Sequence, residues 1–215
     1  MRFTSGILLI WLSCFLISPC YGHGHDVNCY DERLLTYDLG ERDRLPEFPN
    51  SISSKLSGKW GPHAFQYPRA MVPAGCDPVK WKRLRVVAVA KRYIGLPYEH
   101  HHVPAWQPTN GKGPGLDCSN FTAWVYNYGL GMKFTSDIQK QSDGTKAPGR
   151  RLKDGDSFEP GDLLFILKKD RSEVSHVVIY VDANHIIDSR GAGVRLRPFK
   201  GWYKSHFSHA RRIIA

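Results

Sequence analysis

A cysteine and a histidine, each in a distinctive local sequence, are the residues of this chain best suited to covalent chemistry. Cys118 follows Asp117 at the start of an amphipathic stretch, which is typical of a helix that begins with an acidic cap. His176 opens a run of β-branched residues, which is typical of a strand. A thiol becomes a good nucleophile as the thiolate, and an imidazole and a helix N-terminus both favour that form. The pair therefore predicts a hydrolase with a cysteine nucleophile and a histidine base.

Two helices are expected to position these residues. Asp77 and Pro78 provide a cap and a first turn for one helix, and Gly95 provides its stop. Its apolar face comprises Trp81, Leu84, Val87, Ala88 and Ile94. The second helix is expected to begin at Cys118 and to end at Gly129, with Phe121, Trp124, Val125 and Tyr128 on its apolar side.

Short strands are expected after the helices, at residues 163–167, 174–181, 185–189, 194–196 and 210–214. Because they follow one another closely, we expect them to pair in an antiparallel sheet. Helices followed by strands indicate an α+β fold in which N-terminal helices pack on one face of that sheet.

The first 22 residues have the organisation of a secretory signal, in which Arg2 precedes an apolar stretch at residues 6–18 and small residues precede a cleavage site after Gly22. The stretch is shorter than the roughly 20 residues of a membrane-spanning helix, and no later stretch qualifies. We expect a signal peptide at 1–22, an N-terminal arm at 23–76 and a catalytic domain at 77–215. The mature protein is then extracytoplasmic, periplasmic or secreted, without an integral membrane segment.

Three cysteines remain once Cys14 and Cys20 are assigned to the signal. In an oxidising compartment an odd number leaves one thiol over, and Cys118 has the reactive setting. Cys29 and Cys76 then form the natural disulfide pair, and three buried free thiols are the alternative. The formal net charge of +10 favours anionic surroundings, but no nucleic-acid-binding motif accompanies it, so we expect no nucleic-acid partner.

The motifs around these residues resemble the NlpC/P60 family of papain-like cysteine peptidases over about residues 77–215. They are Leu96-Pro97-Tyr98, Leu116-Asp117-Cys118-Ser119, and the segments 160–165, 175–180 and 210–214. The resemblance implies that Cys118 is the nucleophile and His176 the base. It also implies cleavage of the amide between γ-linked D-glutamate and a diamino acid in bacterial wall peptides. This chemistry needs no metal and no organic cofactor.

A third polar residue of the family orients the histidine and is usually His, Asn or Gln on the next strand. Counting through the turn after His176 places Asp188 there, and His185 three residues earlier is the alternative. A carboxylate that accepts a hydrogen bond from the imidazole Nδ1–H would fix the tautomer and stabilise the imidazolium.

The substrate-binding residues that the resemblance implies are Tyr98, Asp117 and Ser119, which bind a free L-alanine amine in some relatives. Two features depart from the family pattern. A histidine-containing loop at 99–106 replaces a Trp-Gly-Gly run, and Asn120 replaces a glycine.

The leading interpretation is a secreted cysteine hydrolase acting on the stem peptide of peptidoglycan, of unassigned oligomeric state. The rebuilt 99–106 loop leaves open a papain-like amidase or acyltransferase with a non-wall substrate. An inactive basic module that binds wall polymer is a third interpretation, which the complete Cys/His pair disfavours.

Overall fold

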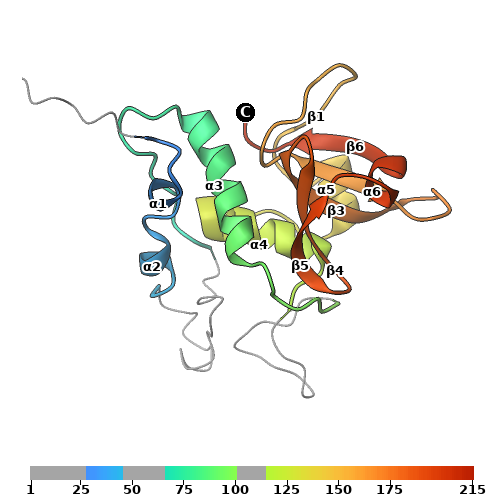
Figure 1. Cartoon of the computed structure of the whole chain (residues 1–215), viewed down its shortest axis with the longest axis horizontal. Helices are drawn as coiled ribbons and strands as arrows, with labels where there is room; N and C mark the ends of the chain where they lie inside the picture. The colour runs from blue at the N-terminus through green and yellow to red at the C-terminus, as the bar shows by residue number, and fades with distance from the viewer. Residues whose placement is uncertain (1–27, 46–65, 101–114) are drawn as a thin grey trace, which may run out of the picture.

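The computed structural model describes residues 28–45, 66–100 and 115–215. The expected signal peptide and nearly all of the 99–106 loop lie outside these ranges. The helices are α1 (Glu32–Leu35), α2 (Leu39–Arg42), α3 (Pro78–Arg92), α4 (Cys118–Leu130), α5 (Ile138–Asp143) and α6 (Trp202–Ser205). The strands are β1 (Arg150–Arg151), β2 (Leu163–Leu167), β3 (Val174–Asp182), β4 (His185–Arg190), β5 (Gly193–Pro198) and β6 (Phe207–Arg212). Helices α3 and α4 lie between the sheet and the arm helices α1 and α2 (Figure 1).

The strands form one antiparallel sheet in the order β1-β6-β2-β3-β4-β5. This arrangement confirms the predicted α+β class. The five predicted strands are all present; β2 has the predicted bounds, and the ends of the others differ by up to three residues. The short helices α1, α2, α5 and α6 and the two-residue strand β1 were not predicted, because each is too short to show a hydrophobic period.

Helix α3 begins as its sequence predicts. The Asp77 side chain accepts a hydrogen bond from the Lys80 N–H, and Pro78 occupies the first helical position. The helix ends at Arg92, so Ile94 lies beyond it and is 45% exposed. The prediction that Ile94 belongs to the buried face is therefore wrong, whereas Trp81, Val87 and Ala88 are buried.

Helix α4 runs past the predicted stop at Gly129 and ends at Leu130. Gly131 caps it in the left-handed conformation, with φ 69°, which a residue without a Cβ adopts at little cost. Gly129 instead lies against α3, where an added Cβ would approach the Val89 side chain to 3.3 Å. Gly129 thus serves close helix packing and not helix termination.

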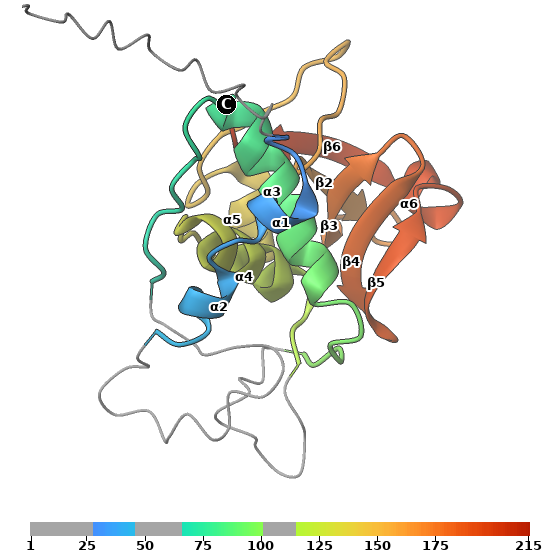
Figure 2. The same ribbon diagram turned by 60° about the vertical axis from the view of Figure 1, so that its left-hand side comes forward.

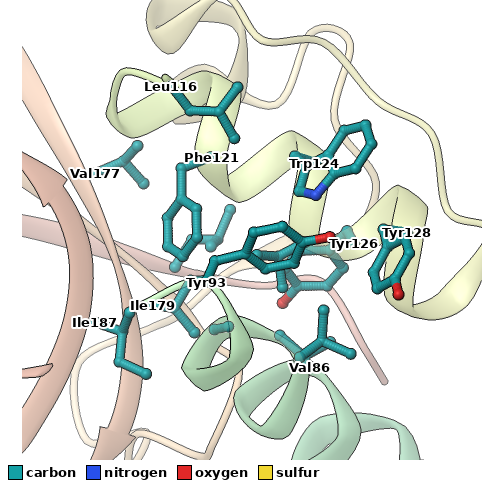
Figure 3. Close-up of a cluster of buried hydrophobic side chains, with 14 of the residues drawn as sticks. Val86, Tyr93, Leu116, Phe121, Trp124, Tyr126, Tyr128, Val177, Ile179 and Ile187 are labelled. Atoms are coloured by element: carbon teal, nitrogen blue, oxygen red, sulfur yellow. The ribbon is translucent and has the colours of Figure 1, made fainter. Parts of the chain in front are cut away.

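The core lies between α3, α4 and the sheet (Figure 3). Helix α4 contributes Phe121 and Trp124, α3 contributes Val86, and the sheet contributes Ile179 and Ile187, all buried. Fully burying one such side chain stabilises the fold by roughly 1.5–3 kcal/mol. This packing holds the N-terminal end of α4 at a constant position relative to β3 and β4.

The N-terminal arm, residues 28–45 and 66–76 in this structure, is tied to α3. A disulfide joins Cys29 to Cys76, as predicted, and Cys118 is the free thiol among the described cysteines. The alternative of three free thiols is therefore wrong. A disulfide that closes a loop of 47 residues stabilises a protein by roughly 2–4 kcal/mol.

A fully buried arginine, which the sequence did not reveal, anchors the arm further. Arg85 of α3 donates hydrogen bonds to the Leu35 carbonyl at 2.8 Å and the Gly129 carbonyl at 2.6 Å, and it pairs with Asp38. Burial raises the pKa of Asp38, but Arg85 and Arg42 outweigh burial and lower it. Figure 2 shows α1 and α2 lying along α3 and α4 as this network requires.

None of the helices formed by residues 28–45, 66–100 and 115–215 is long and apolar enough to cross a membrane.

Candidate active site

A cleft of about 540 Å³ opens beside the start of α4. Four residues that the sequence singled out line it, namely Tyr98, Asp117, Cys118 and Ser119. The cleft is also lined by His100, Asn120, Ser136, Asp137, Ile138 and Ser175. Residues 136–138 lead into the unpredicted helix α5, so sequence reasoning missed one wall of the cleft.

Cys118 is the first residue of α4, and the Asp117 side chain caps that helix by accepting a hydrogen bond from the Asn120 N–H at 2.9 Å. The thiol is 8% exposed and makes no disulfide. Backbone N–H groups at a helix N-terminus can stabilise negative charge that develops on an atom at this position.

His176 lies on β3 and links Cys118 to Asp188. Its Nε2 atom is 2.7 Å from Asp188 Oδ2, and its ring is hydrogen-bonded to the Cys118 side chain. Because Nε2 is hydrogen-bonded to Asp188, Nδ1 is the ring nitrogen left for the Cys118 sulfur. The expectation that the carboxylate would meet Nδ1 is therefore wrong. The alternative third residue, His185, lies at the exposed β3–β4 turn, where its Nδ1 is 2.9 Å from Asp182 Oδ1.

Asp188 is fully buried and is held by two further side chains. Its Oδ2 accepts a hydrogen bond from the Tyr203 hydroxyl at 2.7 Å, and its Oδ1 accepts one from Arg197 Nε. Sequence reasoning missed Tyr203 and Arg197 because their approach depends on the β4–β5 register and on α6. They hold in place the carboxylate that is hydrogen-bonded to His176.

The electrostatics of this group favour a charged imidazole. Burial alone lowers the pKa of His176, but the hydrogen bonds to Asp188 and Cys118 outweigh burial and raise it to about 9. Burial raises the pKa of Asp188, and the hydrogen bonds from His176, Tyr203 and Arg197 outweigh that effect and lower it. His176 is thus an imidazolium at neutral pH, beside an ionised Asp188 and in contact with Cys118.

The three predicted substrate-binding residues lie together at the cleft. Asp117 Oδ1 accepts a hydrogen bond from the Ser119 hydroxyl at 3.3 Å. Burial raises the pKa of the Tyr98 hydroxyl, and negative charge on Cys118 and Asp117 adds to this effect, which places Tyr98 near both. Asn120 also contacts Asp117, since its Nδ2 group donates hydrogen bonds to both carboxylate oxygens at 3.1 Å.

No metal centre is formed by the residues that the structure describes. They contain no group of three or more His, Cys, Asp or Glu side chains arranged to hold a metal ion. His100 lines the cleft, whereas His101 and His102 lie outside the described residues.

A thiol at a helix N-terminus that faces an imidazole, itself oriented by a buried polar side chain, is the arrangement of a papain-like cysteine peptidase. The model of the NlpC/P60 family matches residues 97–212, which is more than half of the chain. The chain belongs to the NlpC/P60 family.

Three known proteins illustrate the similarity. The probable endopeptidase p60 of Listeria grayi is 32% identical over 116 residues, which are 53% of this chain and 19% of that protein. The gamma-DL-glutamyl hydrolase of Bacillus subtilis (strain 168) is 28% identical over 133 residues, 60% of this chain and 29% of that protein. The chain thus spans less than a third of these curated relatives. The structure of the peptidoglycan hydrolase RipB from Mycobacterium tuberculosis has a TM-score of 0.51 at 18% identity, and the match covers 84% of this chain and 83% of that one.

Proposed function

We propose that this protein is a cysteine hydrolase that cleaves the amide between γ-linked D-glutamate and a diamino acid in peptidoglycan stem peptides. The observation that carries the proposal is the linked group Cys118–His176–Asp188 at an open cleft. The names of the similar proteins, an endopeptidase, a gamma-DL-glutamyl hydrolase and a peptidoglycan hydrolase, support the choice of substrate.

The first half of the reaction forms an acyl-enzyme. The Cys118 thiolate attacks the carbonyl carbon of the amide, and the negative oxygen that develops accepts a hydrogen bond from the Cys118 backbone N–H at the helix start. The His176 imidazolium donates its Nδ1 proton to the leaving nitrogen, and the C–N bond breaks. Asp188 keeps the ring oriented and stabilises its charge throughout this step.

The second half releases the acid product. The now neutral His176 takes a proton from water, and the hydroxide attacks the thioester carbonyl carbon. The C–S bond breaks, and the thiolate–imidazolium pair is restored. The same nitrogen therefore acts first as a general acid and then as a general base.

The proposed location is outside the cytoplasm. Disulfides such as Cys29–Cys76 form and persist in oxidising compartments. A formal net charge of +10 also suits a compartment that contains anionic wall polymers.

The proposed activity is tested by digesting purified peptidoglycan with residues 23–215 and identifying the products by mass spectrometry. We expect fragments that end in D-glutamate, together with new free amines on the diamino acid, because the scissile amide joins these two residues. The Cys118→Ala variant provides the background digest. Cleavage at another bond would reassign the substrate, and a digest identical to the background would contradict the proposal.

A further inference from the structure

The Asp188 carboxylate contacts two positively charged groups, one through each of its oxygens. Its Oδ2 atom is 2.7 Å from Nε2 of the His176 imidazolium, and its Oδ1 atom accepts a hydrogen bond from Arg197 Nε. Asp188 is fully buried, and the side chain of Arg197 is 22% exposed. Charges that are largely removed from water interact more strongly and are screened less by salt than charges at the surface. The charge of Arg197 therefore acts directly on the group that contains His176.

Four side chains carry the charges of the site in the state from which the proposed reaction begins. The Cys118 thiolate and the Asp188 carboxylate are negative, whereas the His176 imidazolium and the Arg197 guanidinium are positive, so the set has no net charge. Without Arg197 the same set would carry one excess negative charge. An excess negative charge nearby disfavours loss of the thiol proton and makes the imidazolium hold its proton more tightly.

Two further ionisable side chains lie close to this set. The Tyr203 hydroxyl donates a hydrogen bond to Asp188 Oδ2 at 2.7 Å, and burial, together with the Asp188 charge, raises the pKa of Tyr203 to about 12. Tyr203 is therefore neutral at physiological pH and does not change the charge of the set. Arg190 lies over the ring of Trp202, with its guanidinium carbon 4.2 Å from the ring centroid, and it is hydrogen-bonded to Tyr203.

A second arginine on β5 provides a natural comparison. Arg195 is the partner of Asp188 in the register between β4 and β5. Its side chain is nevertheless exposed, and its Nε donates a hydrogen bond to the Ala192 carbonyl at 3.1 Å. Arg195 and Arg197 thus carry the same charge on one strand, but Arg197 is the one whose hydrogen bond to the Asp188 carboxylate is found in the structure.

We propose that Arg197 is a positioning residue whose charge balances that of Asp188, so that Cys118 and His176 form their ion pair within a set of side chains that has no net charge. Arg197 acts through Asp188 and not by contact with the substrate. The inference rests on the thiolate–imidazolium pair of the proposed function and names a residue that makes this pair favourable at neutral pH.

The pH dependence of Cys118 alkylation in residues 23–215 tests this proposal without a substrate. Iodoacetamide reacts with the thiolate, so the alkylation rate rises around the pH at which the thiol loses its proton. In Arg197→Gln we expect this midpoint to lie about one pH unit above that of the wild type, because a nearby charge shifts a pKa by about that much or more. Arg197→Lys keeps the charge and should keep the wild-type midpoint.

Two more variants separate the charge of Arg197 from a general effect of substitution. Arg195→Gln removes an exposed charge from the same strand, is the matched control and should leave the midpoint unchanged. The double variant Asp188→Asn/Arg197→Gln removes one charge of each sign, so we expect its midpoint to return to the wild-type value. The recovery concerns the midpoint and not kcat, because His176 still lacks its carboxylate in the double variant.

An unchanged midpoint in Arg197→Gln, or an equal rise in Arg197→Gln and Arg197→Lys, would overturn the proposal. Thermal unfolding shows whether each variant is folded. If Arg197→Gln does not fold, the same charge is measured by comparing Asp188→Asn with the double variant, whose midpoint should be higher by about one pH unit. Equal midpoints in these two would also overturn the proposal. A peptidoglycan digest without products would overturn the proposed function alone, since alkylation needs no peptide.

Discussion

The Cys118→Ala variant is expected to hydrolyse wall peptides at least about 1,000-fold more slowly than the wild type, because no other side chain replaces the attacking sulfur. The fold should persist, since the change removes one atom at the first turn of α4 and leaves the Asp117 cap intact. Initial rates on a synthetic stem peptide measure the loss, and circular dichroism with thermal unfolding checks the fold.

Cys118→Ser is the matched control for shape. It keeps a hydrogen-bonding side chain at the same position but replaces the sulfur with a much less acidic hydroxyl, so we expect it to be nearly as inactive. If Cys118→Ala retained more than about a tenth of the wild-type rate, the sulfur would not be the nucleophile, and the covalent mechanism would fail.

The Asp188→Asn variant is expected to lower kcat by about 100- to 10,000-fold with little change in KM, because the carboxylate stabilises the imidazolium in the transition state. It should also move the pH profile. The thiolate–imidazolium pair needs a protonated His176, whose pKa is lowered by burial but raised overall to about 9 by the hydrogen bonds to Asp188 and Cys118. Activity of the wild type should therefore fall as the pH rises through about 9, and the neutral carboxamide of the variant should shift this fall to lower pH.

His185→Asn is the matched control for Asp188, because it changes the other candidate on the same strand. We expect near wild-type kcat, since His185 contacts Asp182 at the exposed turn. A large loss of kcat in the His185 variant, together with nearly normal kcat in the Asp188 variant, would show that His185 is the residue that orients His176. Thermal unfolding of both variants separates a catalytic loss from a loss of the Tyr203 and Arg197 contacts to residue 188.

The parts of the fold that depend on local sequence could be predicted well. Asp77 and Asp117 cap α3 and α4 as their positions indicate, and residues 163–167 form β2 with the predicted bounds. These features follow from interactions within a few residues, namely side-chain caps and side-chain alternation. The odd number of cysteines outside the expected signal, with Cys118 as the unpaired one, also predicted the Cys29–Cys76 disulfide.

The parts that depend on tertiary contacts could not be predicted. Arg85 occurs in an ordinary helical sequence, and only the fold reveals that it is fully buried against the arm. Similarly, Tyr203 and Arg197 reach Asp188 through the sheet register and α6. The choice between His185 and Asp188 as the partner of His176 depended on turn geometry. A change in the length of the turn alters the strand register and so changes which face of the sheet every following side chain points to.

The rate at which iodoacetamide alkylates Cys118 at pH 7 tests the central claim most directly, because it reports the reactive thiolate without assuming any substrate. We predict that wild-type residues 23–215 react about tenfold or more faster than the His176→Ala variant, with the label mapped to Cys118 by mass spectrometry. Equal rates in the two proteins would contradict the claim that His176 activates Cys118.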